Sequence, residues 1–121
     1  MMHWYDAAMR IAQNSPAGPL DPAALDKFHA EVAELRAATT LLDAVQEAAD
    51  CVYYPVKAVH TGLISLEQAT VLIRSVLDEA GISLADATTA MVAKYAVRQH
   101  LRRKDHAAET AAVSAALGWG A

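Results

Sequence analysis

The chain has 121 residues, 55% of them hydrophobic, and a formal net charge of −4. This length suits a single domain with a substantial core, and the acidic balance argues against general nucleic-acid binding, which needs Lys and Arg concentrated on one surface. The lone cysteine, Cys51, has no partner for an internal disulfide, and no segment reaches the roughly 20 apolar residues that span a bilayer. Because the N-terminus also lacks a signal-peptide core, we expect a cytoplasmic protein that binds neither nucleic acid nor membrane.

The first half of the chain reads as a series of helices. Hydrophobic residues recur at helical spacing, alanine is abundant, and no segment has the pattern of a strand. A first helix is predicted over about 4–13, followed by the breaker-rich stretch 14–19. Asp21 as N-cap and Pro22 at the first helical position predict a second helix that runs to about Ala38.

The next two helices have clear boundary signals and one internal breaker. A helix is predicted over about 41–60, after a turn at Thr39 and Thr40, and Pro55 inside it should kink or break it. A capping box of Ser65 and Gln68 then predicts a helix over about 66–80, which Gly81 should end.

The end of the chain predicts two further helices. Ser83 caps one that runs to about Arg103, and Asp105 caps another that runs to about Leu117. The prediction is therefore one all-α domain over residues 1–121, a helical bundle with its core at about 22–103. The helices over about 4–13 and 105–117 flank that core.

Two acidic motifs occupy consecutive predicted helices, Glu31-x-x-Glu34 and Glu47-x-x-Asp50. A spacing of three keeps each pair on one helix face. In an antiparallel hairpin that turns near residues 40–41, Glu31 is level with Asp50 and Glu34 with Glu47. Four carboxylates then point toward one volume, and an all-oxygen ligand set is what Mg²⁺ prefers. The fold prediction is thus a bundle built around an antiparallel two-helix metal-binding hairpin.

The alternative is that these acids only face solvent. Asp43, Glu47 and Asp50 follow one another at i, i+4 and i+7 with no lysine among them, and each like-charge neighbour costs a helix roughly 0.2 to 0.5 kcal/mol. This cost favours a function for the second pair. On the first helix Lys27 is able to pair with Glu31, so a solvated face stays open as an explanation there.

The acidic motifs carry a family resemblance. The segment 28–35, FHAEVAEL, followed by Glu47-Ala48-Ala49-Asp50, resembles the ExxE and ExxD signature of the all-α nucleotide pyrophosphohydrolases. Residues 47–54 are also similar to phosphoribosyl-ATP pyrophosphohydrolase, whereas Lys94-Tyr95-Ala96-Val97-Arg98 resembles an element of MazG-like domains and favours that branch. Two departures from the family pattern are Val92, where asparagine is frequent, and Pro55 in a helix that is usually continuous.

The resemblance implies a chemistry and a set of residues. It implies Mg²⁺-dependent hydrolysis of a nucleoside triphosphate between its α and β phosphates, with Mn²⁺ as a plausible substitute. The expected metal ligands and catalytic residues are Glu31, Glu34, Glu47 and Asp50, one of which acts on the attacking water.

The expected substrate-binding residues are Lys94, Arg98, Tyr54 and Lys57. Lys94 and Arg98 would contact the phosphates, although cations at this place also offset a helix dipole. Tyr54 and Lys57 share the acidic helix face, where a packed tyrosine and a surface lysine are the alternatives.

Both acidic helices carry apolar or small residues on more than one face, which predicts self-association. The resemblance also implies a homodimer or homotetramer with active sites near the subunit contacts. Two other functions stay open: a phosphoribosyl-ATP pyrophosphohydrolase-type enzyme, and a non-catalytic helical interaction module whose acidic face binds a basic partner.

Overall fold

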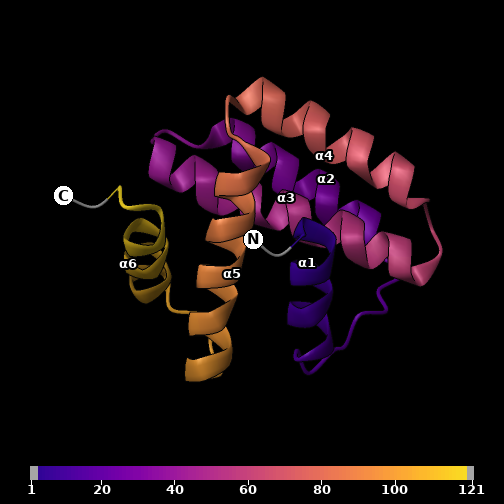
Figure 1. Cartoon of the computed structure of the whole chain (residues 1–121), viewed down its shortest axis with the longest axis horizontal. Coiled ribbons are helices and arrows are strands. Elements are labelled where there is room, and N and C mark those ends of the chain that lie inside the picture. The colour runs from indigo at the N-terminus through magenta and orange to yellow at the C-terminus, as the bar shows by residue number, and fades with distance from the viewer. Residues whose placement is uncertain (1–2, 120–121) are drawn as a thin grey trace.

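The protein is an all-α helical bundle. The structure, a computed structural model, describes residues 3–119, and over that range the ordered elements are helices joined by short turns (Figure 1). The helices are α1 (Trp4–Gln13), α2 (Ala24–Ala37), α3 (Leu41–Thr61), α4 (Leu66–Ala80), α5 (Leu84–Leu101) and α6 (His106–Leu117). None of the helices in this range is long and apolar enough to cross a membrane.

Helix α3 is the centre of the bundle. It runs beside α2 and α4 in the upper half of Figure 1, while α1, α5 and α6 lie across them below. Every other helix packs against α3, and its apolar side chains Val45, Val52 and Val56 are fully buried. Phe28 from α2 and Met91 from α5 are among the largest side chains of the same core. A polar residue on α3 therefore faces either a gap between helices or another polar group.

Most helix boundaries follow the predicted caps. Ser65 and Gln68 form the expected capping box, and the side chains of Ser83 and Asp105 each accept a hydrogen bond from the backbone N–H three residues later. Thr40 caps α3 in the same way by accepting from Asp43 N–H at 3.1 Å. Because α3 begins directly after this cap, the link between α2 and α3 is short and the two consecutive helices pack against each other.

The start of α2 corrects the prediction for Asp21. The N-cap is Ala23, without a side-chain hydrogen bond. One Asp21 oxygen accepts from Ala23 N–H at 3.0 Å, and the other accepts from Lys27 at 2.7 Å. The backbone N–H of Asp21 donates to Thr61 at 2.8 Å. Asp21 thus ties the start of α2 to the end of α3 and does not cap a helix.

Pro55 does not break α3, which is continuous from Leu41 to Thr61. A proline in a helix interior lacks the N–H donor for the preceding turn and costs about 3 kcal/mol or more. Here Pro55 is itself fully buried beside Val52 and Val56, and this packing holds the helix together across it.

Candidate functional site

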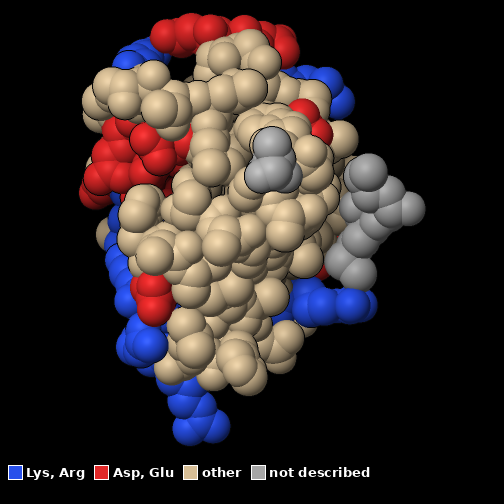
Figure 2. Space-filling view, turned by 90° about the vertical axis from the view of Figure 1, so that its left-hand side faces the viewer, with Lys and Arg blue, Asp and Glu red and all other residues tan. Residues whose placement is uncertain are grey.

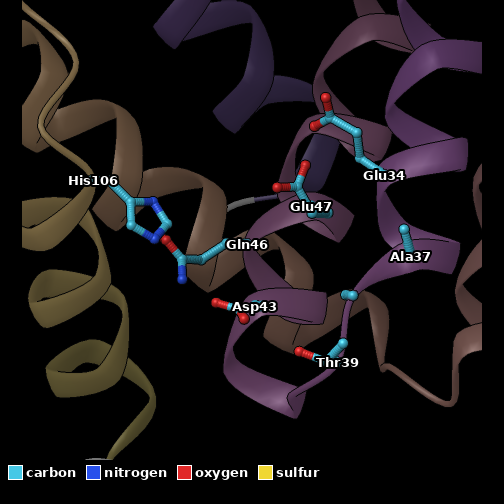
Figure 3. A pocket seen from close by; sticks show the side chains of 8 residues that line it. Glu34, Ala37, Thr39, Asp43, Gln46, Glu47 and His106 are labelled. Atoms are coloured by element: carbon cyan, nitrogen blue, oxygen red, sulfur yellow. The ribbon is translucent and has the colours of Figure 1, made fainter.

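The α2–α3 hairpin brings three acidic side chains together. Glu31 and Glu34 from α2 and Glu47 from α3 each offer a carboxylate oxygen, and these oxygens lie within 4.8 Å of one another. Glu34 is exposed, whereas Glu31 and Glu47 are half-buried. Figure 3 shows Glu34 and Glu47 reaching toward the same space from the two helices. We call Glu31, Glu34 and Glu47 the carboxylate cluster.

The electrostatics of the cluster are unfavourable without a cation. Burial, together with the charge of Asp50 and the close approach of the Glu47 carboxyl group, raises the pKa of Glu31 to about 8. Burial and the contact with Glu34 also raise the pKa of Glu47. The Oε2 atom of Glu31 is buried and has no hydrogen-bond partner among the described residues. Burying a polar atom without a partner is costly, so the cluster is suited to take up a proton or a cation.

Asp50 lies beside the carboxylate cluster and is already paired. Its Oδ2 accepts a hydrogen bond from Lys94 Nζ at 2.8 Å, and its Oδ1 accepts from the Tyr95 hydroxyl at 2.7 Å. All three side chains are buried. The structure therefore brings three of the four predicted acids into one group, while Lys94 and Tyr95 hold the fourth toward α5. Each Asp50 oxygen keeps a further lone pair.

Lys94 and Arg98 stand one turn apart on α5, and both have acidic partners. Besides Asp50, Lys94 Nζ donates to the carbonyl oxygen of Gln46 at 3.4 Å. Arg98 Nη2 donates to Glu109 at 2.9 Å, and its guanidinium carbon lies 4.8 Å from the centre of the Tyr95 ring. The predicted phosphate-binding cations are thus positioned by ion pairs.

The structure separates Tyr54 from Lys57. Burial, followed by the charges of Asp50 and Glu31, raises the pKa of Tyr54 to about 12, which places this side chain near the acids. Lys57 is buried instead near Asp21, with Nζ 3.8 Å from Oδ2. Lys57 therefore contacts the segment that joins α1 to α2 and lies away from the cluster.

Two cavities adjoin the cluster. The larger, about 330 Å³, is lined by Glu34, Ala37, Ala38, Thr39, Asp43, Gln46, Glu47 and His106 (Figure 3). The smaller, about 120 Å³, is lined by Gln46, Glu47, Lys94, Arg98, Lys104, His106 and Glu109. Because both cavities include Glu47, a ligand held at the cluster has space on the side facing α6.

Sequence reasoning missed three residues of this site. Tyr95 and Glu109 are buried partners of Asp50 and Arg98, and His106 lines both cavities. A polar residue that falls inside an apolar helix stripe, as Tyr95 does, is a detectable signal. Glu109 and His106 come from α6, whose placement against α5 no local sequence pattern reveals.

Charge is unevenly distributed around the site. Figure 2 shows a broad patch of acidic side chains near one edge of the face it displays, with Lys and Arg side chains below it.

No protein-family model matches the chain, and no match was found among curated proteins or solved structures. The resemblance to the all-α nucleotide pyrophosphohydrolases thus stays a prediction that depends on the residues of this site.

Proposed function

We propose that the protein is a Mg²⁺-dependent nucleotide pyrophosphohydrolase that converts a nucleoside triphosphate to a monophosphate and pyrophosphate. The observation that carries the proposal is the carboxylate cluster, whose oxygens lie within 4.8 Å of one another and include the unpartnered buried Oε2 of Glu31. The resemblance of the motifs at residues 28–35, 47–50 and 94–98 to that superfamily supports the same activity.

The cluster fits a hard divalent cation. All its donors are carboxylate oxygens, which Mg²⁺ and Mn²⁺ accept readily, and neither sulfur nor imidazole is among the grouped ligand atoms. The raised pKa of Glu31 shows that negative charge there is poorly balanced by the protein alone. A cation supplies that balance and gives the buried oxygen a partner.

The chain's own residues divide the work of hydrolysis in this proposal. The water oxygen forms a bond to the α phosphorus, and the bond from that phosphorus to the oxygen bridging the α and β phosphates breaks. Pyrophosphate leaves with the electron pair of that bond. Glu31, Glu34, Glu47 and Asp50 would hold the ion, and one of these four carboxylates would accept the water proton. A bound divalent ion neutralises phosphate charge and makes its water more acidic.

Asp50 keeps its predicted role as a fourth ligand in this proposal. Lys94 and Tyr95 each donate to one of its oxygens, which fixes the carboxylate beside the cluster, and each oxygen keeps a lone pair with which it would bind an ion.

Lys94 and Arg98 are the proposed phosphate contacts. Both line the small cavity that includes Glu47, so both are adjacent to a substrate held at the cluster. Their ion pairs with Asp50 and Glu109 pre-set their positions, and an arriving phosphate offers the guanidinium fork a second acceptor.

We further propose that the enzyme is a homodimer or homotetramer. Several large apolar side chains of the isolated chain are exposed, among them Leu41 at 58%, Leu66 at 45% and Val71 at 64%. Leu41 begins one of the two site helices, so a subunit contact there would lie near the cluster. Sedimentation equilibrium tests this point, and a monomer at micromolar concentration would contradict it.

The decisive experiment measures pyrophosphate release from a panel of nucleoside triphosphates with and without Mg²⁺. Wild type should release pyrophosphate only with the ion, and Glu47→Gln should reduce the rate at least about 100-fold, because losing a ligand disrupts the positions of ion and water. Glu67→Gln is the matched control, because Glu67 is an exposed glutamate on α4; its rate should equal wild type.

Other outcomes identify the alternatives. Release from phosphoribosyl-ATP alone would assign the related enzyme, and this substrate belongs in the panel. No release from any substrate, or release undiminished in Glu47→Gln, would reject the hydrolase and favour an acidic interaction surface.

A further inference from the structure

A larger cavity, about 780 Å³, lies between the C-terminal ends of α1 and α5. None of the three acids of the carboxylate cluster lines it, although it shares Arg98 and Lys104 with the small cavity beside Glu47. Gln99 on α5 donates to the carbonyl oxygen of Ile11 on α1 at 3.2 Å and joins these two helices, which run near each other in the lower half of Figure 1. The lining residues are Asn14, Ser15, Pro16, Ala17, Tyr53, Lys57, Tyr95, Arg98, Gln99, Arg102, Arg103 and Lys104. We call this cavity the basic groove.

The basic groove concentrates positive charge in a chain that is acidic as a whole. Lys57, Arg98, Arg102, Arg103 and Lys104 are five of the ten Lys and Arg residues of the protein, and none of the Asp or Glu residues in the described part of the chain lines the groove. A helix C-terminus favours a nearby cation, but its partial charge is only about half a unit. The dipole of α5 therefore does not account for a cluster of this size.

Two of these cations have no acidic partner within residues 3–119. Lys57, Arg98 and Arg103 form ion pairs with Asp21, Glu109 and Asp105. Arg102 and Lys104 are exposed, and neither forms an ion pair with any residue between 3 and 119. The groove thus keeps uncompensated positive charge at its rim.

The backbone at Arg102 is a second, independent observation. Arg102 ends α5 in the left-handed conformation, with φ of 59°, and no other described residue except glycine has a positive φ. The ends of α3, α4 and α6 use glycine at the same position. A left-handed residue with a Cβ is disfavoured, so the backbone at this helix end is strained, and glycine would relieve the strain. The strained position instead has an arginine, whose cationic side chain lines the groove.

We propose that the basic groove is a second ligand site, which binds a small organic phosphate bearing at least two negative charges. Arg102 and Lys104 hold the phosphate at the rim, and the body of the ligand rests against Pro16 and Ala17. A cavity of this volume is in the range of small-molecule sites. Binding at this site does not need a divalent ion, because Lys and Arg side chains supply its positive charge.

The test uses ADP as the probe, in buffer with EDTA and no divalent ion, with titration calorimetry on the full chain. Wild type should bind ADP saturably, and Lys104→Gln should weaken binding at least threefold. Arg74→Gln is the matched control, because Arg74 is exposed on α4 and outside the groove; its affinity should equal wild type.

Arg102→Gly separates binding from folding. Glycine suits the backbone at this position, so the melting temperature should stay level or rise, while ADP affinity falls at least threefold. Because Lys104 also lines the small cavity beside Glu47 whereas Arg102 lines only the groove, ADP affinity unchanged in Arg102→Gly would overturn the proposal, as would no ADP binding at millimolar concentration.

Three further binding measurements test other modes of binding, and any of the following results would overturn the proposal. ADP binding that requires Mg²⁺ and is lost in Glu47→Gln would locate the ligand at the carboxylate cluster. Equally tight binding of adenosine would remove the role of phosphate. Binding of a single-stranded oligonucleotide far more tightly than ADP would replace the small ligand by nucleic acid. Failure of the hydrolysis assay leaves all these outcomes unchanged, because none of them measures turnover.

Discussion

Two regions that share helix α3 differ in whether their buried acidic side chains have hydrogen-bond and ion-pair partners. In the carboxylate cluster, Glu31 and Glu47 have raised pKa values and Glu31 keeps an unpartnered buried oxygen. One turn away, Asp50 is matched by Lys94 and Tyr95 at 2.8 and 2.7 Å. The acid of the second region has donors within the protein, whereas the first region would be balanced by a proton or, as we propose, by a bound cation.

The paired region extends onto α6. Glu109 is 3% exposed and accepts hydrogen bonds from Arg98 at 2.9 Å and from the Asp105 backbone at 3.1 Å. Each buried acid of this region therefore has a defined donor. The two regions thus differ in how their acidic side chains are partnered within the protein, and three measurements sharpen or break that comparison.

The largest effect is expected from Lys94→Met in the paired region. Removing one partner of a buried ion pair leaves the other charge uncompensated and costs about 3 to 5 kcal/mol, and Asp50 would keep only the Tyr95 hydroxyl. Urea unfolding measures the loss. The matched control is Arg36→Met, which removes the exposed pair with Glu79 and should leave the midpoint nearly unchanged. Equal midpoints for both variants would show that the Lys94 pair does not stabilise the fold.

The second effect concerns the cluster itself. If Mg²⁺ binds there, it stabilises the folded state by about 2.7 kcal/mol when the free ion is about 100 times its Kd. Thermal unfolding should therefore shift upward with added Mg²⁺ and return to the starting value with EDTA. Glu47→Gln should abolish the shift and Lys57→Gln should retain it, because Lys57 pairs with Asp21 away from the cluster. A shift that survives in Glu47→Gln would locate the ion elsewhere.

Local sequence patterns predicted much of this fold. Helical periodicity identified all six helices that the described residues form, and the caps at Ser65, Ser83 and Asp105 set three of their starts to within a residue or so. These signals succeed because a cap depends only on a side chain and the backbone three residues later. Asp21 failed as a cap because its carboxylate pairs with Lys27 and its backbone N–H donates to Thr61, which is 40 residues away.

The candidate site was predictable only where it depends on one hairpin. The spacing of Glu31, Glu34 and Glu47 on two consecutive helices was sufficient to bring their oxygens together. The pairing of Asp50 depends on Lys94, which is 44 residues away, and that of Arg98 depends on the docking of α6. Such contacts are set by how whole helices pack, which no local motif encodes.

The smallest effect, and the closest comparison of the two regions, is the pH dependence of stability in EDTA. Burial and neighbouring acids raise the pKa of Glu31 from 4.5 to about 8, so between these values the folded state holds a proton that the unfolded state has released. Stability must then fall as pH rises through this window, by roughly 1 to 2 kcal/mol once solvent screening of a partly exposed carboxyl is considered. Glu31→Gln should flatten the slope.

The paired region should respond with the opposite sign. Burial alone would raise the pKa of Glu109, but hydrogen bonds from Arg98 and the Asp105 backbone lower it below 4.5, so its contribution is present above that pH and is lost on acidification. Metal-free wild type should thus be most stable near pH 5, in urea midpoints measured from pH 3 to 9, and Mg²⁺ should remove the decline at high pH because ionised carboxylates bind it. A decline above pH 5 that persists unchanged in Glu31→Gln would mean that Glu31 is not its source, and a decline that persists also in the double variant Glu31→Gln/Glu47→Gln would end the contrast between the two regions.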